Sequence, residues 1–338
     1  MEYREILDNA RKILAPKCRV CKVCSGEACR GELPGSGGKG SGESFVRAYK
    51  KLADVKINMD TIYENKGQDT SCLLFGQEFA APLFAAPISG MASNYTGYFD
   101  ETSFNDCLVN GMLDAGCAAF TGDGVSADFF DGPVSVVAAA GGRAVPTIKP
   151  WDRDTVMQKA EKAQKAGAFA VAMDVDSAGL PMLAMAGKPG AAKSVEELAE
   201  IRAQIKVPFI IKGIMTADGA RKALEAGADG IVVSNHGGRV LDHTKAPVEV
   251  LPDICKAVEG RMTILVDGAI RTGVDLFKVL ALGADGALIG RPYVVAAHGG
   301  GREGVALYTR KVIGELKDVM KMTGCASIAD ITPDKVCI

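Results

Sequence analysis

The sequence has little that would suit a membrane or a nucleic acid. No uninterrupted apolar stretch is long enough to cross a bilayer, and the charged residues 1–17 lack the apolar core of a signal peptide. No long basic run occurs, and 39 Lys and Arg nearly balance 41 Asp and Glu, so nucleic acid is not an expected partner. We therefore expect a cytoplasmic protein that acts on a small molecule and has no membrane partner. In that compartment its ten cysteines should be thiols or metal ligands rather than disulfides.

Aromatic residues are also scarce, at 6% of the chain, whereas alanine contributes to an apolar fraction of 48% and the chain has 40 glycines. Small apolar side chains suit helices that pack closely around a parallel sheet, and 338 residues are enough for one large α/β barrel or for two domains. From about residue 77 onward, short apolar runs alternate with helical patterns. The expected strands are 83–88, 118–120, 144–148, 169–175, 207–212, 231–233, 263–267 and 287–290.

A weak internal repeat supports this alternation. Ala-Gly-Ala-Asp-Gly at 226–230 recurs as Gly-Ala-Asp-Gly at 283–286, and in each copy a glycine ends a helix before the next strand begins. Eight such strand–helix units predict a (β/α)8 TIM barrel over residues 77–338. The expected helices are 104–115, 154–166, 195–203, one capped by Thr216, and a long one from about Gly301.

Residues 1–76 are expected to form an N-terminal extension, with helices at 1–17 and 43–57 and a small hairpin at the end of an irregular segment. Its glycine-rich segment 31–42 is expected to be a loop without a packed interior. Four cysteines precede that loop with the spacing C-x2-C-x2-C-x4-C. Sulfurs so close along the chain can converge on one metal, so an iron–sulfur cluster, zinc and uncomplexed or redox-active thiols all stay open. The four are Cys18, Cys21, Cys24 and Cys29.

The residues that follow the strands predict where chemistry would occur, because barrel active sites lie at the carboxyl ends of the strands. The sixth strand runs into Ser-Asn-His-Gly-Gly-Arg, where His236 can exchange a proton and Arg239 can grip a carboxylate. The chain has only three histidines, and His243 and His298 lie outside any such context. Arg271 and Arg291 follow glycines after the last two strands, which predicts a phosphate site.

Residues 207–331 resemble the FMN-dependent 2-hydroxy-acid oxidising family, which includes glycolate oxidase, lactate oxidase and flavocytochrome lactate dehydrogenases. Residues before 144 resemble it only in layout. The matching motifs are Ile211-Lys212-Gly213, Ser234-Asn235-His236-Gly237-Gly238-Arg239, Asp267-Gly268-Ala269-Ile270-Arg271 and Ile289-Gly290-Arg291-Pro292.

The resemblance implies an FMN enzyme, in which His236 takes a proton from the substrate while a hydride equivalent passes to the flavin. It implies that Asp176 pairs with this histidine and raises its pKa, that Lys212 stabilises charge at the pyrimidine edge of the flavin, and that Arg239 binds the substrate carboxylate. It also favours a homotetramer. The implied FMN contacts are Pro87, Ile88, Ser89, Thr121, Asp174, Lys212, Ser234, Asp267, Gly268, Arg271, Gly290 and Arg291.

Several positions depart from the family pattern, most of them on the substrate side, whereas the threonine that Asp174 replaces normally faces the flavin. The N-terminal segment lacks the usual tyrosine, Asp174 replaces a threonine, and Lys188 is the only base in 177–192, where a second arginine is usual. Pro146 to Lys149 replace a glutamine and a tyrosine after the third strand, which makes Lys149 a candidate substrate contact. We therefore expect an intact flavin cradle with a rebuilt substrate wall.

The substrate and the electron acceptor stay open at this stage, and so do two other functions. One is an FMN-dependent isopentenyl diphosphate isomerase, which shares the barrel and the FMN pocket but lacks the His-Gly-Gly-Arg base. The other is a barrel that binds flavin or metal without catalysis.

Overall fold

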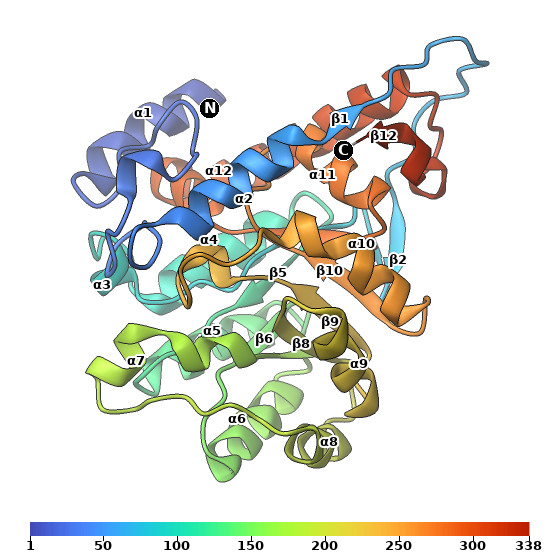
Figure 1. Ribbon diagram of the computed structural model, residues 1–338. Coiled ribbons are helices and arrows are strands. Elements are labelled where there is room, and N and C mark those ends of the chain that lie inside the picture. The colour runs from blue at the N-terminus through green and yellow to red at the C-terminus, as the bar shows by residue number, and fades with distance from the viewer. Residues whose placement is uncertain (338) are drawn as a thin grey trace.

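The computed structural model describes residues 1–337, and it confirms the closed barrel (Figure 1). Eight parallel strands pair in chain order, and the last of them returns to the first. Nearly all of their residues are buried, as a parallel sheet covered on both faces requires. The barrel strands are β4 (Leu83–Ala85), β5 (Ala118–Thr121), β6 (Val145–Ile148), β7 (Val171–Asp174), β8 (Phe209–Ile214), β9 (Gly230–Val233), β10 (Thr263–Val266) and β11 (Gly286–Ile289).

Helices surround the barrel, and those expected from the sequence are present within a few residues of the predicted bounds. Thr216 caps its helix as predicted, because its hydroxyl accepts the amide hydrogen of Gly219 at 2.9 Å. The long C-terminal helix differs from the expectation: it begins at Arg291 and is interrupted at Gly301, where φ is 55°. The surrounding helices are α4 (Glu101–Leu113), α5 (Asp128–Ala139), α6 (Arg153–Lys165), α8 (Val195–Gln204), α9 (Ala217–Glu225), α10 (Pro247–Val258), α11 (Gly273–Ala281) and α12 (Arg291–Met322).

The barrel interior is a packed apolar core that is closed at the amino-terminal end of the strands. Phe84, Phe120 and Leu265 lie inside it, fully buried. The hairpin of β2 (Cys72–Leu74) and β3 (Gln77–Phe79) covers this end, and the ring of Phe79 packs edge-on against Phe84 with centroids 5.0 Å apart. The functional residues are therefore found at the opposite, carboxyl end, as expected for this fold.

The N-terminal segment packs on the barrel and joins the C-terminus (Figure 1). Helix α1 (Tyr3–Leu14) contacts α12, and β1 (Lys56–Ile57) pairs antiparallel with β12 (Val336–Cys337). Helix α2 (Glu43–Asp54) lies between α1 and β1 in the chain. The boundary at residue 76 stays a prediction.

The expectation that the glycine-rich loop has no packed interior is wrong. Gly35, Gly37 and Gly38 are buried together with Ser36. A Cβ atom at Gly37 would lie 2.0 Å from the carbonyl oxygen of Cys29, so the absence of side chains is what allows this backbone to pack closely. The middle of the loop, residues 35–38, is therefore part of the molecule's interior.

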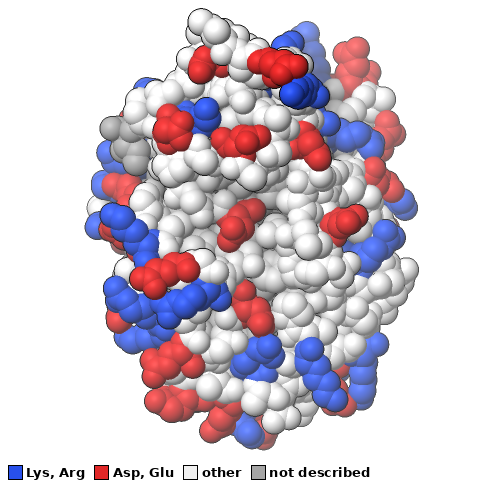
Figure 2. Space-filling view, turned by 90° about the vertical axis from the view of Figure 1, so that its right-hand side faces the viewer, with Lys and Arg blue, Asp and Glu red and all other residues white. Residues whose placement is uncertain are grey.

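Charged side chains of both signs are interspersed on the face shown in Figure 2, in keeping with the net charge of −2. Among residues 1–337, none of the helices combines the length and apolarity needed to cross a membrane.

Candidate active site

A cavity of about 490 Å³ opens at the carboxyl end of the barrel, within the usual range of about 300–1,000 Å³ for ligand sites. Most of the residues singled out from the sequence line it. Asp176 and Ser234 lie behind that lining, in contact with it, and Thr121 is buried in β5. The predicted residues in the wall are Pro87, Ile88, Ser89, Lys149, Asp174, Lys212, His236, Arg239, Asp267, Gly268, Arg271, Gly290 and Arg291.

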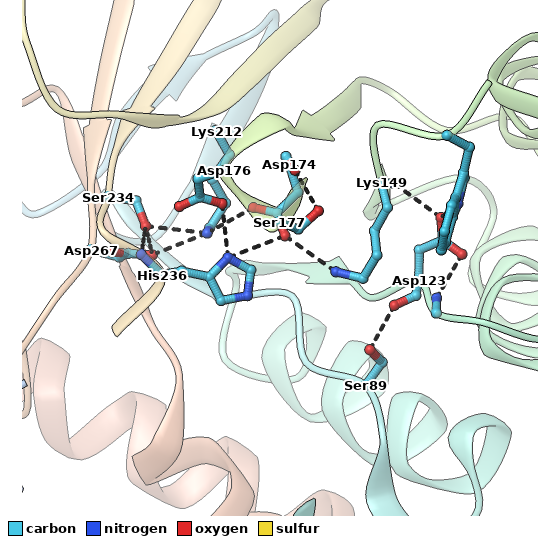
Figure 3. A network of polar contacts seen from close by, with 12 residues as sticks. Ser89, Asp123, Lys149, Asp174, Asp176, Ser177, Lys212, Ser234, His236 and Asp267 are labelled. Carbon is cyan, nitrogen blue, oxygen red and sulfur yellow. Dashed lines mark hydrogen bonds and ion pairs between the residues drawn. The ribbon is translucent and has the colours of Figure 1, made fainter. Parts of the chain in front are cut away.

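His236 is held by two carboxylates (Figure 3). It follows β9 in a left-handed conformation, with φ of 57°, and its Nδ1 lies 2.8 Å from Oδ1 of Asp176 and 3.5 Å from Oδ2 of Asp174. A neutral imidazole that donates its Nδ1–H to Asp176 keeps its lone pair on Nε2. This nitrogen points away from the carboxylates, so the geometry leaves a proton acceptor at the cavity (Figure 3).

The same carboxylates control the protonation of the imidazole. Burial favours neutral His236, but the charges of Asp174 and Asp176 together outweigh it and raise the pKa of this histidine. Burial raises the pKa of Asp176 as well, whereas His236 and Lys212 overcome burial at Asp174 and hold its pKa well below the usual value. Asp174 is therefore a fixed charge, and Asp176 is the partner that shares a proton with the imidazole.

Lys212, on β8, is buried at 3% exposure among three acceptors (Figure 3). Its ammonium lies 3.1 Å from Oδ1 of Asp174, 3.2 Å from Oγ of Ser234 and 3.6 Å from Oδ2 of Asp267. Burial alone would lower the pKa of Lys212, but the carboxylates reverse the effect and raise it, so the lysine stays charged. A permanent positive charge is thus fixed at the cavity wall.

Lys149 is positioned by a buried acid, Asp123, to which sequence reasoning gave no role. The carboxylate of Asp123 accepts hydrogen bonds from the backbone N of Lys149 at 3.0 Å and from Nε1 of Trp151 at 2.7 Å, and it also pairs with Lys159. The ammonium of Lys149 consequently lies 3.6 Å from Oδ2 of Asp174, facing the cavity. Asp123 and Lys159 are 36 residues apart, so no local pattern in the sequence indicated this contact.

Arg239 contacts the N-terminal loop. Its Nη1 donates to the carbonyl oxygens of Gly35 at 2.7 Å and Gly37 at 3.3 Å, and its Nη2 donates to Oδ1 of Asn94 at 2.9 Å. Burial lowers the pKa of Arg239 to about 10, which keeps it charged at neutral pH. Sequence reasoning missed Asn94 as a part of this site. The resemblance placed residues 29–42 where the family's tyrosine touches the substrate, but it did not predict the contact with Arg239.

Arg291 is held by the same loop. It donates from Nε to the carbonyl of Ser36 at 2.6 Å and from Nη2 to those of Gly37 at 3.0 Å and Gly237 at 3.1 Å. Its guanidinium also lies 3.8 Å from the ring centroid of Phe45, on α2. The loop 31–42 therefore covers the site through two arginines that follow different barrel strands.

The four N-terminal cysteines line a neighbouring cavity of about 520 Å³, which shares Tyr95, Ala269, Arg271 and Arg291 with the first. None of the cysteines in residues 1–337 forms a disulfide. The tightest group of potential metal ligands in the described chain is instead Asp174, Asp176 and His236.

Comparison with known proteins identifies the family. A model of the FMN-dependent dehydrogenase family matches residues 35–183 and 182–338, nearly the whole chain. The chain belongs to this family. The match confirms the resemblance found in the motifs and extends it upstream of residue 144.

Individual relatives in the family match over shorter stretches. The chain is 43% identical over 146 residues to a peroxisomal (S)-2-hydroxyacid oxidase of Arabidopsis thaliana, a match that covers 43% of this chain and 40% of the relative. It is 47% identical over 143 residues to an L-lactate dehydrogenase of Pectobacterium atrosepticum, covering 42% of this chain and 37% of the relative. Less than half of each of these relatives is thus matched.

Solved structures match over nearly their full length. A mandelate oxidase variant with 2-hydroxy-phenylacetamide superimposes with a TM-score of 0.81 at 27% identity, covering 99% of this chain and 97% of that one. A mandelate oxidase mutant with a monooxide FMN adduct has a TM-score of 0.77 at 30% identity, covering 92% of this chain and 98% of that one. The barrel and the N-terminal segment thus share one arrangement with these FMN proteins.

The residues at the cavity fit the FMN that the family binds. Within the described chain, three buried polar atoms at its wall have no hydrogen-bond partner: Nε of Arg271, Oγ1 of Thr147 and Oδ1 of Asp267. Helix α12 begins at Arg291 with no side-chain cap in the described structure. Pro292 has no N–H and the N–H of Tyr293 donates to the carbonyl of Gly290, so the amide that remains for a phosphate in this first turn is that of Arg291. Guanidinium and amide donors at one end and the Lys212 ammonium at another match an anionic phosphate joined to a polar ring.

Proposed function

We propose that this protein oxidises a 2-hydroxy acid to the 2-oxo acid, with FMN in the cavity and His236 as the base. The observation that carries the proposal is the 2.8 Å contact between Nδ1 of His236 and Asp176, because in the neutral imidazole it fixes the proton on Nδ1 and leaves the lone pair on Nε2, and because it stabilises the imidazolium that forms next. FMN, when bound, accepts the two electrons that leave the substrate carbon. The proton from the substrate hydroxyl passes to Nε2 of His236.

Arg239 binds the substrate carboxylate in this proposal, and hydrogen-bond counting supports the role. Its contacts with the loop and with Asn94 use three of its five N–H groups. The Nε–H and one Nη2–H of Arg239 remain. Elsewhere in the chain, Arg47 uses its Nε and Nη2 to hold the carboxylate of Glu249 at 2.7 and 2.6 Å. A carboxylate can therefore bind without displacing the loop.

Lys212 and Lys149 have different roles. Lys212 is charged and held by three acceptors, so it stabilises negative charge that develops on the cofactor ring. Lys149 follows β6, which flanks β7 on the side away from β8, so it reaches the same carboxylate, Asp174, from the other side and adds a second positive charge beside the substrate. These charges also keep Asp174 ionised next to His236.

The apolar part of the wall supports a substrate larger than glycolate. Leu180, Met182 and Leu183, at the start of α7 (Pro181–Met185), line the cavity. An apolar substituent at the 2-position would cover these side chains from water. The similarity to mandelate oxidase points the same way. We propose a 2-hydroxy acid with an apolar substituent as the substrate.

The family match and the His236–Asp176 contact favour this activity over the isopentenyl diphosphate isomerase and over a barrel without catalysis. A homotetramer in the cytoplasm, with neither membrane nor nucleic acid as a partner, remains part of the proposal.

Anaerobic mixing of the FMN-loaded protein with 2-hydroxy acids tests the proposal, because oxidation of the substrate bleaches the flavin absorption. Glycolate, lactate and mandelate form a series of increasing apolar size. Bleaching by at least one of them is expected, and most rapidly by mandelate. FMN-loaded protein that no 2-hydroxy acid bleaches would contradict the proposal.

Two histidines provide a matched pair of variants. His236 and His243 both have left-handed backbones, with φ of 57° and 55°, a conformation that asparagine tolerates. His236→Asn should keep FMN and slow the bleaching by about 10²–10⁴-fold, the usual contribution of a general base. His243→Asn changes an exposed residue and should leave the rate unchanged. Equal rates in the two variants would remove His236 from the mechanism.

A further inference from the structure

The proposed function makes no use of the cysteine segment, Cys18 to Cys29. Cys18 follows α1, and Cys29 ends a single turn of 3-10 helix, η1 (Glu27–Cys29). All four cysteines line the second cavity. Four thiols from twelve residues of chain therefore face one space.

The backbone of this segment is bent in ways that contacts within it do little to support. Val20 has φ of 45°, a conformation that a β-branched residue rarely adopts, and its side chain is 5% exposed. Such a residue costs about 1–3 kcal/mol and persists only where its surroundings hold it in place. Between Cys18 and Cys29, the segment's regular structure in the described chain is the single turn η1. Val20 packs in the main hydrophobic core, which holds its backbone, and a ligand bound by all four sulfurs would add cross-links within the segment.

The spacing of the sulfurs distinguishes between kinds of metal site. A single zinc ion with Zn–S bonds of about 2.3 Å would place its four sulfurs about 3.8 Å apart. Three potential ligand atoms within 4.8 Å of one another are found once in the described chain, at Asp174, Asp176 and His236. No three of the four cysteine sulfurs therefore lie as close together as a single zinc ion would hold them. An iron–sulfur cluster separates its thiolates more widely, because each binds a different iron.

The charge of the cavity suits such a cluster, because four thiolates make it anionic overall. One acidic residue, Asp275, lines this cavity, among several basic ones. The basic residues are Arg19, Lys22, Arg271, Lys278, Arg291 and Lys311.

We propose that Cys18, Cys21, Cys24 and Cys29 bind a [4Fe–4S] cluster, and that this cluster holds the loop 31–42 over the barrel. The loop begins two residues after Cys29, and Oγ of Ser36 donates to the carbonyl of Lys17 at 2.8 Å, which ties it to the start of the cysteine segment. On its other side, the backbone N of Lys39 donates to the carbonyl of Gly238 at 2.8 Å. The site is independent of which substrate the barrel oxidises.

Metal analysis of the full-length protein tests the first half of the proposal. After anaerobic purification and reconstitution with ferrous iron and sulfide, about four irons and four acid-labile sulfides per chain are expected. A dithionite-reduced sample should also give the low-temperature electron paramagnetic resonance signal of a reduced cluster, which flavin does not produce. About one zinc per chain, or no metal after reconstitution, would overturn the assignment.

Cysteine variants connect the metal to these residues. Cys24→Ser should lose the cluster, whereas Cys337→Ser, which replaces an exposed thiol on β12, should keep it. Both variants should retain FMN, which shows that the barrel is folded. Equal iron contents in the two variants would overturn the ligand set.

Amide hydrogen exchange tests the second half. Residues 35–38 should exchange at least about tenfold faster in Cys24→Ser than in Cys337→Ser, because loss of the cluster frees the loop to open. Unchanged exchange in a variant that has lost its iron would overturn the role of the cluster in holding the loop.

Discussion

Replacement of Asp176 by asparagine should separate the charge of this residue from its position. Nδ1 of His236 lies 2.8 Å from Asp176 and 3.5 Å from Asp174, but Asp174 also faces two ammonium groups, those of Lys212 at 3.1 Å and Lys149 at 3.6 Å. Asp176 contacts no lysine or arginine within 4.0 Å in the described chain, so its charge acts mainly on the histidine. Asparagine keeps an oxygen that can accept the Nδ1–H bond and removes only the charge.

The magnitude follows from the loss of one opposite charge in contact with the ring. Such a charge shifts a pKa by about 1–3 units, and each unit corresponds to about 1.36 kcal/mol. In the native protein the pKa of His236 is raised, so the imidazole stays protonated to higher pH and the base form appears only above that value. Asp176→Asn lowers the pKa of His236, and the base form should appear about 1–3 units lower in pH.

The measurement is the pH dependence of kcat/KM for a 2-hydroxy acid, which reports the ionisation of the free enzyme. In the native enzyme, the acid limb of this pH profile, where kcat/KM falls as the pH is lowered, should have its midpoint above the ordinary histidine pKa of about 6.5. In the variant, the midpoint should move to lower pH. The plateau rate should fall, because a weaker base accepts the proton less readily. Asp267→Asn is a suitable control, because Asp267 contacts Lys212 rather than His236, and it should move the limb much less. An acid limb that stays in place or moves upward in Asp176→Asn would refute the reasoning.

Three further substitutions test the surroundings of this pair. Gly213→Ala would place a Cβ atom 2.6 Å from the side chain of Asp176, at a residue whose φ is 105°. We expect a loss of about 1–3 kcal/mol in unfolding free energy and slower flavin reduction. Native values for both would contradict the close packing. Lys212→Met leaves buried carboxylates without their partner and should cost about 3–5 kcal/mol in urea unfolding, and a loss below 1 kcal/mol would refute the ion-pair network. Arg291→Lys keeps the charge but removes the planar group stacked on Phe45 and shared among three carbonyls, so amide exchange of residues 35–38 should accelerate; an unchanged rate would show that Arg291 does not hold the loop.

The barrel was predictable because each strand–helix unit is a local pattern, and the errors have local causes. Helices α5, α10 and α11 were not predicted. Helices α5 and α10 each contain a proline, Pro133 and Pro252, which obscures the helical pattern, whereas α11 contains none. The start of α12 was missed because glycines at 299–301 interrupt its sequence pattern. All eight strands were found, because their short apolar runs stay recognisable even where β6 contains Pro146 and β8 contains Gly213.

The site was predictable only where a single strand end carries its residues. His236 and Arg239 share one motif, but Asp176 lies 60 residues from the histidine that it contacts, and its pairing came from the family resemblance rather than from any spacing. The contact between Asn94 and Arg239 spans 145 residues and had no counterpart in the motifs. Contacts of this kind become visible only when the barrel brings the ends of its strands together.

The glycine-rich loop shows why composition alone is ambiguous. Glycine leaves a chain free to move where nothing surrounds it, but it also allows two backbones to touch where side chains would keep them apart. At Gly37 the second effect decides, because the carbonyl of Cys29 and the guanidinium groups of Arg239 and Arg291 surround it. Both arginines are more than 200 residues away in the sequence, so the glycine count could not show which effect applies. Because the loop binds Arg239, which is proposed to hold the substrate carboxylate, any change that frees the cysteine segment before the loop should also weaken substrate binding.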